Sequence, residues 1–154
     1  MELRIRQASP DDLHELARLF DAYRQFYDQP SDVRGAREFL AERMESRQSL
    51  VIVAAGDDAL VGFTQLYPMF SSVRMAPIWI LNDLYVDTDV RRLGIGGLLL
   101  EASAAAARAA GATRLVLETA RENLGARALY RAAGWSEEST QWYGIDLLPA
   151  ADMN

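Results

Sequence analysis

Residues 84–100 constrain the fold more than any other part of the chain. They predict a strand that ends in Leu84-Tyr85-Val86, then a basic turn with glycines, then a helix that runs on from Gly94. The first amide groups of a helix have no partners within it and carry a partial positive charge. A unit of strand, turn and helix with this composition therefore predicts a phosphate-binding site.

The turn Arg91-Arg92-Leu93-Gly94-Ile95-Gly96 suits a pyrophosphate in two ways. Its glycines lack the Cβ atom that would keep phosphate oxygens away from the backbone, and its arginines add full positive charges. A P-loop is excluded because no lysine follows the glycines, and the dinucleotide fingerprint is excluded because Leu99 stands where it needs glycine. The alternative is that the glycines only form a tight turn.

Hydrophobic periodicity predicts the remaining elements. Strands are expected at 3–7, 50–55, 60–67, 78–86, 113–119, 135–138 and 141–147. Helices are expected from Ser9 to beyond Tyr23, from about 36 to 47, and at 94–110 and 123–133. The order β-α-α-β-β-β-α-β-α-β-β predicts an α+β fold, with a mixed, mostly antiparallel central sheet flanked by helices. We expect one domain over 1–148 and a C-terminal tail over 149–154.

Composition argues against several classes of function and of site. The 154 residues fit one domain, and a net charge of -6 makes nucleic acid an unfavourable partner. With no cysteine and a single histidine, His14, the chain has no disulfide or Cys-based zinc site, and we expect no metal. The alternating charged and apolar residues at 1–6 do not form a signal peptide, and no apolar stretch reaches the roughly 20 residues of a membrane span. We therefore expect a soluble, cytoplasmic protein with no membrane partner.

Two motifs resemble those of the GNAT superfamily of N-acetyltransferases. Arg91-x-x-Gly94-x-Gly96 resembles its acetyl-CoA signature, Gln/Arg-x-x-Gly-x-Gly/Ala. Asn123-x-x-Ala126-x-x-Leu129-Tyr130-x-x-x-Gly134-Trp135 resembles its second motif. The motifs stand in the superfamily's order with a helix and a strand between them, and the predicted elements match its fold over nearly the whole chain.

The resemblance implies roles for both motifs. The acetyl-CoA contacts it implies are Leu84, Tyr85 and Val86 for the pantetheine arm, Arg91, Arg92, Leu93, Gly94, Ile95, Gly96 and Gly97 for the pyrophosphate, and Asn123 and Ala126 on the later helix. Tyr130 would protonate the departing thiolate. The alternatives are that Tyr130 is a core aromatic and that Asn123 caps its helix, a role compatible with cofactor binding.

Residues 81–86 resemble most closely those of diamine and polyamine acetyltransferases. Many of the diamine enzymes carry a glutamate, assigned as the base, at the position of Asn82. Asn82 cannot accept a proton at neutral pH, although it remains a candidate substrate contact. Neighbouring strand residues point to opposite faces, so Asp83 is not expected to replace the glutamate. The base would then be a chain of waters, or absent if the amine arrives neutral.

The acceptor site is expected near Tyr27 and Asp28, after the first helix, and near the loop at 69–76. Aromatic rings with a carboxylate suit a cationic amine. The alternative is a hydrophobic packing corner with a solvated Asp28.

Taken together, the residues and the resemblance predict an enzyme, an acetyl-CoA-dependent N-acetyltransferase that acts by direct attack of a small-molecule primary amine, polyamine-like or other. The alternatives are a non-catalytic acyl-CoA-binding or regulatory module and an enzyme that acetylates a peptide or protein amine. The apolar stretch Trp142-Tyr143-Gly144-Ile145 predicts a strand edge covered by a second copy, and hence a homodimer.

Overall fold

The computed structural model describes residues 2–91 and 93–148. The tail predicted at 149–154 lies outside the described residues. In chain order, the elements are β1 (Arg4–Gln7), the 3-10 turn η1 (Pro10–Asp12), α1 (Leu13–Phe26), α2 (Val33–Glu45), β2 (Leu50–Ala55), β3 (Leu60–Ser71), β4 (Ala76–Val86), the 3-10 turn η2 (Thr88–Val90), α3 (Ile95–Ala109), β5 (Leu115–Val116) and α4 (Leu124–Ala132).

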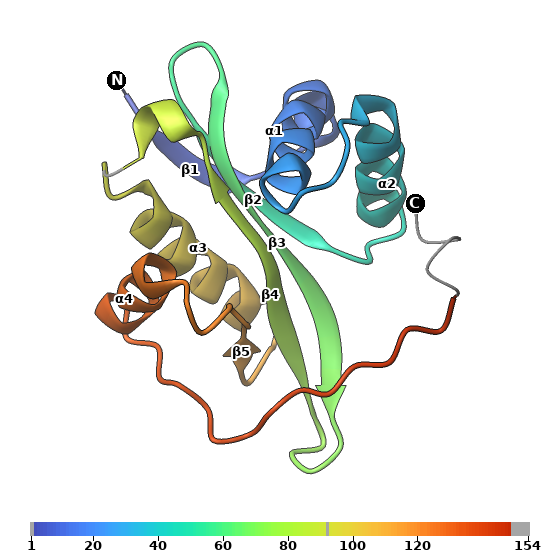
Figure 1. Ribbon diagram of the computed structural model, residues 1–154, viewed down its shortest axis with the longest axis vertical. Helices are drawn as coiled ribbons and strands as arrows, with labels where there is room; N and C mark the ends of the chain where they lie inside the picture. Colours follow the sequence, from blue (N-terminus) through green and yellow to red (C-terminus); the bar gives the residue numbers. More distant parts are fainter. Residues whose placement is uncertain (1, 92, 149–154) are drawn as a thin grey trace.

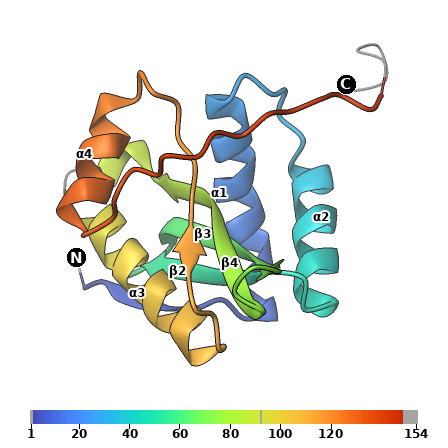
Figure 2. The ribbon, with the colours of Figure 1, turned by 90° about the horizontal axis from the view of Figure 1, so that it is seen from below.

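The five strands form one sheet in the order β1-β2-β3-β4-β5. The first four are antiparallel neighbours, whereas β5 runs parallel to β4. Helices α1 and α2 cover one face of the sheet, and α3 and α4 cover the other (Figures 1 and 2). This arrangement confirms the predicted α+β class with a mixed, mostly antiparallel sheet.

Each face of the sheet carries its own core. On one face, Leu16, Leu40 and Phe63 are fully buried between α1, α2 and the strands. On the other, Leu99 and Leu100 bring α3 against the sheet. Burial of each such side chain contributes about 1.5–3 kcal/mol. The two cores fix the positions of α1 and α3 relative to β4. The candidate active site lies between the end of α1 and the start of α3.

The turn between α1 and α2 is held by a buried carboxylate, Asp21. Its oxygens accept hydrogen bonds from the main-chain N–H of Asp32 at 2.6 Å, the Ser31 hydroxyl at 2.7 Å and the Gln25 amide at 3.1 Å. The Asp32 carboxylate in turn accepts a hydrogen bond from the N–H of Gly35 and caps α2. These contacts set where the C-terminal end of α1 points.

Strands β4 and β5 pair over only two residue pairs, Trp79 with Leu115 and Ile80 with Val116. The strand predicted at 113–119 is therefore shorter than expected, because residues 117–119 diverge from β4 and line a cavity. Along its other edge, β4 stays paired with β3 from Ala76 to Val86. The divergence leaves a gap in the sheet beside the second half of β4.

The two predicted closing strands are wrong in the described part of the chain. Residues 135–148 form neither helix nor strand. Trp135 packs beside Tyr130, and Glu137 and Glu138 form ion pairs with Arg127 and Arg114. After these contacts the segment runs extended across the molecule toward the side of α2 (Figures 1 and 2). A strand needs a paired neighbour, and the two-residue β5 offers little edge for one.

Candidate active site

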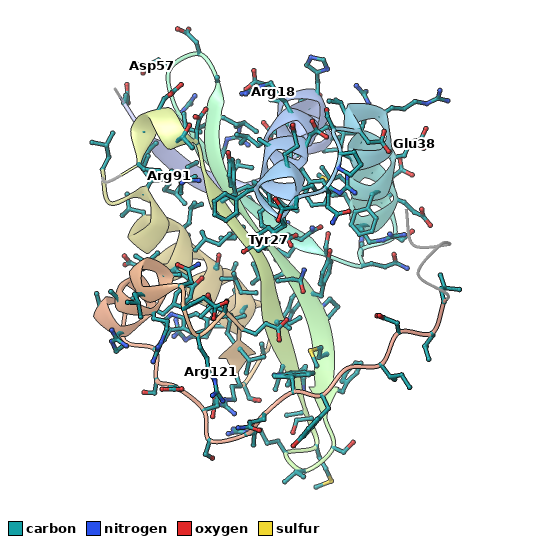
Figure 3. All side chains as sticks on the ribbon, viewed as in Figure 1. Arg18, Tyr27, Glu38, Asp57, Arg91 and Arg121 are labelled. Carbon is teal, nitrogen blue, oxygen red and sulfur yellow. The ribbon has the colours of Figure 1, made fainter. Side chains whose placement is uncertain are left out.

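A cavity of about 580 Å³ lies where β4 and β5 diverge. Five parts of the chain line it: the end of α1, the second half of β4, the start of α3, residues 117–119 and α4. Tyr27 and Arg91, both labelled in Figure 3, lie beside β4 on its wall. Of the predicted site residues, the cavity brings together Tyr27, Asn82, Leu84, Tyr85, Val86, Arg91, Gly94, Ile95, Gly96, Gly97, Asn123, Ala126 and Tyr130.

The predicted phosphate turn forms one end of this cavity. Gly94 precedes α3 in the left-handed region with φ of 78°, a conformation that favours glycine. The first α-helical hydrogen bond here runs from the N–H of Leu98 to the carbonyl of Gly94. The amide groups of the three residues between them are thus left without partners in the helix. No acidic side chain stands in the first turn, so the electrostatics fit an anion.

Gly96 and Gly97 serve different purposes. A Cβ at Gly97 would meet nothing within 4 Å, so this position faces open space at the cavity wall. A Cβ at Gly96 would lie 3.1 Å from Cδ2 of Leu129. Gly96 therefore also allows α3 and α4 to approach closely, a packing role that the spacing of the motif did not reveal.

Arg91 is exposed and lines the cavity near the turn. Its Nε donates a hydrogen bond to the carbonyl of Val86 at 3.0 Å, and its guanidinium lies 5.6 Å from the ring centroid of Tyr85. These contacts leave donors of the guanidinium available for an anion. The predicted contact Leu93 is exposed but does not line the cavity, and Arg92 lies outside the described residues.

Asn123, the N-cap of α4, and Tyr130, within α4, both line the cavity. The Asn123 side chain caps the helix by accepting a hydrogen bond from the N–H of Ala126 at 3.2 Å. Burial raises the pKa of the half-buried Tyr130 above its ordinary value, and Tyr27 adds to the rise. The Tyr130 hydroxyl therefore stays protonated at neutral pH and can act as a donor.

Aromatic side chains of α1 form the opposite wall. Tyr23, Phe26 and Tyr27 line the cavity, and the Tyr27 ring is 5.2 Å from Tyr23 and 5.3 Å from Phe26. Phe26 and Tyr27 remain 59% and 57% exposed. Helical periodicity placed Tyr23 on the first helix without assigning it a site role. Its ring packs on Phe63, but its position at the cavity was missed.

Two parts of the predicted acceptor site lie elsewhere. Asp28 follows α1 with φ of 63° and does not line the cavity. The loop at 69–76 closes a long β3–β4 hairpin that extends away from the helices (Figure 1). None of its residues lines the cavity. Sequence reasoning could not foresee this, because it ended the third strand at residue 67 rather than at Ser71.

A β-bulge on β4 overturns the expectation that Asn82 and Asp83 point apart. Gln65 pairs with Asp83 and Leu66 with Leu81, so Asn82 is an extra residue without a partner on β3. The Asn82 amide donates a hydrogen bond to the Asp83 carboxylate at 2.9 Å. Asn82 is exposed at the cavity, whereas Asp83 is buried directly behind it.

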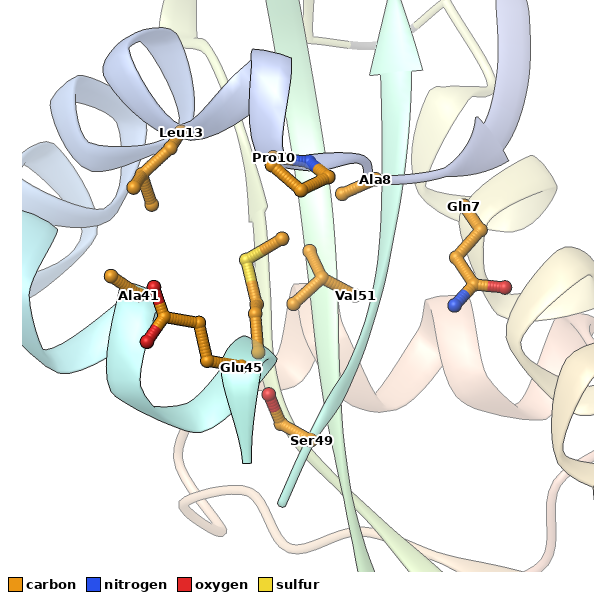
Figure 4. A pocket seen from close by; sticks show the side chains of 9 residues that line it. Gln7, Ala8, Pro10, Leu13, Ala41, Glu45, Ser49 and Val51 are labelled. Carbon is orange, nitrogen blue, oxygen red and sulfur yellow. The ribbon is translucent and has the colours of Figure 1, made fainter. Parts of the chain in front are cut away.

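A smaller cavity of about 200 Å³ lies between η1, α2 and β2 (Figure 4). Its walls are mainly apolar, including Leu13, Ala41 and Val51, with Glu45 as its carboxylate. It does not include the helix N-terminus described above, and within the described residues no Arg side chain lines it, so the larger cavity is the candidate active site.

Two other features are lacking in residues 2–91 and 93–148. No helix there is long and apolar enough to cross a membrane. In the same residues, no group of three or more His, Asp or Glu side chains is placed to hold a metal ion.

Comparison with known proteins agrees with this geometry. The acetyltransferase (GNAT) family matches residues 14–135. The uncharacterized N-acetyltransferase YhfO of Bacillus subtilis (strain 168) is 45% identical over 137 residues, which cover 89% of this chain and 92% of that protein. The crystal structure of a probable acetyltransferase superposes with a TM-score of 0.88 at 36% identity, covering 95% of this chain and 99% of that one.

A more distant relative is the aminoglycoside N(6')-acetyltransferase type 1 of Stenotrophomonas maltophilia, which is 27% identical over 96% of this chain and 95% of its own length. The family match spans the phosphate turn, the diverging strands and Tyr130. This chain belongs to the acetyltransferase (GNAT) family and is an N-acetyltransferase that uses acetyl-CoA.

Proposed function

We propose that the enzyme transfers the acetyl group to a primary amine of a small, cationic molecule, polyamine-like or other. One observation carries this proposal: a single cavity joins the helix N-terminus at Gly94 to the aromatic wall at Tyr27. The first end suits the anionic cofactor and the second suits a cation. The amine would therefore meet the thioester beside β4.

The proposed division of labour follows the cavity. The free amides at the start of α3 and the guanidinium of Arg91 bind the pyrophosphate, and the unpaired edge of β4 from Leu84 to Val86 binds the pantetheine arm. Attack of the amine nitrogen on the thioester carbon expels the thiolate, which takes a proton from Tyr130. Alignment of the reactants and a positioned acid both contribute to the rate of such a reaction.

Two other readings make different predictions. A non-catalytic acyl-CoA-binding module would bind the cofactor without turnover, and it would not need the Tyr130 hydroxyl at the cavity wall. A protein acceptor must approach a surface with a net charge of -6, which favours a basic segment. The aminoglycoside acceptor named for the distant relative belongs to the same chemical class as our proposal, a small polyamine cation.

The test is release of free CoA thiol from acetyl-CoA in the presence of single acceptors. The panel contains diamines, polyamines, aminoglycosides, amino acids and a basic peptide. The chain has neither cysteine nor lysine, so the protein adds no thiol of its own and no lysine amine to the assay. Turnover with a small polycation supports the proposal. Turnover with the peptide alone, or binding without turnover, contradicts it.

A homodimer is part of the same proposal. Tyr143, Ile145 and Leu147, in the extended segment 139–148, are 92%, 85% and 88% exposed. Such a run of exposed apolar side chains is unusual for a monomer. A second copy would cover these exposed side chains. In the dimer, segment 139–148 of each copy lies against its partner.

A further inference from the structure

Two carboxylates are buried in the described part of the chain, Asp21 and Asp83. Asp21 holds a turn between helices, as described above. Asp83 caps no helix, and within the described residues it forms no ion pair. A buried carboxylate without a cation is costly to keep charged. Its place behind the wall of the active site therefore calls for an explanation.

Asp83 is connected to the cavity by its neighbours. Its side chain is only 3% exposed. In front of it stand Asn82, which donates to one carboxylate oxygen, and Tyr23, whose hydroxyl donates to the main-chain oxygen of Asn82 at 3.5 Å, beside the carboxylate. Both Tyr23 and Asn82 line the cavity. The Tyr23 hydroxyl therefore links the cavity to Asp83.

Gln65, which also contacts Asp83, bears on the protonation state of that carboxyl. Its Nε2 donates to Asp83 Oδ2 at 2.6 Å, while its own Oε1 is buried without a hydrogen-bond partner among the described residues. An orphan buried oxygen is unusual. Half a turn of the Gln65 amide would exchange its donor for an acceptor, and a protonated Asp83 could then donate to Oε1. The pair can therefore accommodate both the charged and the neutral carboxyl.

Burial of the Asp83 side chain favours proton uptake by its carboxyl. Burial raises the pKa of the Asp83 carboxyl, and its hydrogen-bond donors offset only part of the rise. The titratable groups that face it are tyrosines: Tyr23 on α1, with Tyr27 beyond it, and Tyr67 on β3. Burial and the charge of Asp83 raise the pKa of Tyr67 to about 12. Arg43 on α2 acts on Tyr67, whose pKa its charge lowers against the effects of burial and Asp83.

We infer that Asp83 is the proton acceptor of acetyl transfer and is reached from the amine through the Tyr23 hydroxyl. This inference rests on the proposed function. An incoming ammonium gives one proton to the Tyr23 oxygen as the Tyr23 hydroxyl proton moves to Asp83. The freed lone pair forms the C–N bond and the C–S bond breaks. The thiolate takes a proton from Tyr130, and the second amine proton leaves the product nitrogen to solvent. Asp83 is thus a positioning residue behind Tyr23, the residue that contacts the amine.

The first experiment measures kcat and KM against pH for wild type, Asp83→Asn, Tyr23→Phe and the control Tyr67→Phe. Tyr67 also faces Asp83 but does not line the cavity. At pH 7 the first two variants should lose about 10²-fold in kcat, and the control should not. Their acetyl-CoA affinity, measured by calorimetry, should match the wild type.

The acceptor provides a sharper readout. Alkyl amines with a pKa near 10 arrive as ammonium, whereas amines with a pKa near 8 are partly neutral at pH 7. The defect of Asp83→Asn should therefore shrink as pH rises, and it should be smaller for the less basic acceptor. If Asp83 had a purely structural role, its substitution would lower kcat by the same factor with both acceptors at every pH.

The second experiment needs no substrate. A carboxyl whose pKa is higher in the folded state binds its proton more tightly after folding. Wild type should therefore lose stability relative to Asp83→Asn as pH rises from about 4, near the unfolded pKa, through the folded pKa of Asp83. Urea unfolding of both proteins at a series of pH values measures this difference.

The outcomes separate the two ideas. An active wild type together with an unaltered Asp83→Asn rate and pH profile overturns the inference and leaves the proposed function standing. A stability difference that does not change with pH also overturns the inference, because Asp83 would not take up a proton in that range. A wild type that transfers acetyl to no amine overturns the proposed function, whatever the unfolding data show.

Discussion

A Cβ atom added at Gly96 would lie 3.1 Å from Cδ2 of Leu129, so the first turn of α3 and the side of α4 are in close contact. Substitution at Gly96 would therefore disturb the packing of α4 as well as the phosphate turn. Its neighbour Gly97 has open space where a Cβ would lie, and it also lines the cavity. Gly97 is thus the position at which cofactor binding can be tested without a steric effect.

Gly97→Glu is expected to weaken acetyl-CoA binding by about 10²-fold, because it places a negative charge where the phosphates would bind. Folding should not suffer, since an acidic residue in the first turn of a helix is favourable. Gly97→Ala is the matched control and should bind like the wild type. Calorimetry measures both affinities, and thermal unfolding measures stability. Equal affinity for the folded Glu variant would place the phosphates elsewhere.

Tyr130→Phe keeps the ring and removes only the hydroxyl. We expect kcat to fall by about 10²–10⁴-fold while acetyl-CoA affinity is nearly unchanged. Tyr143→Phe is the control, because Tyr143 is exposed and does not line the cavity. Steady-state kinetics and calorimetry are the measurements. Normal kcat with weakened binding would make Tyr130 a binding residue rather than an acid.

The proposed dimer should have twice the mass of one chain in dilute light scattering. Ile145→Asp introduces a charge into the exposed apolar segment 139–148 and should shift the protein toward the monomer. Thr140→Asp, in the same segment but at a polar position, is the control. A monomeric wild type would contradict the dimer, and an Ile145→Asp variant that remains dimeric would place the interface elsewhere.

Asp21→Asn tests the turn that sets the direction of the C-terminal end of α1, where the aromatic wall of the cavity lies. The amide keeps one acceptor oxygen but turns an NH2 group toward the donors of the carboxylate. We expect a loss of about 2 kcal/mol in unfolding free energy, the scale of hydrogen bonds to a charged group. Asp11→Asn, an exposed carboxylate before the same helix, should change stability by less than about 0.5 kcal/mol. Urea unfolding compares the two variants.

Local patterns were sufficient for much of the fold. The strand Leu50–Ala55 has the bounds that its apolar run predicts, and Gly94 and Gly111 bracket α3 as expected. These features depend on neighbours in the sequence, through periodicity and caps. The phosphate turn was predictable for the same reason, because its amides, glycines and arginines are contiguous.

Features that depend on distant partners were not predictable. The bulge at Asn82 is a property of the register between β3 and β4, and it brings the side chains of Asn82 and Asp83 into hydrogen-bond contact, against the expectation that they point apart. Tyr23 both packs on Phe63 and lines the cavity. Helical periodicity cannot distinguish a packing role from a role at the site, because it indicates only which residues share a face of the helix. The strands predicted at 135–138 and 141–147 have the right alternation but no paired neighbour within the described chain.

The short ladder between β4 and β5 has a consequence for local stability. Two residue pairs join β5, which precedes α4, to the sheet, whereas ten pairs join β3 to β4. Amide hydrogens of β5 and α4 should therefore exchange with solvent faster than those of β3, through opening that leaves the rest folded. A cofactor spanning both sides of the gap would slow this exchange in proportion to its occupancy. Protection confined to α3 would mean that the cofactor does not bridge the gap.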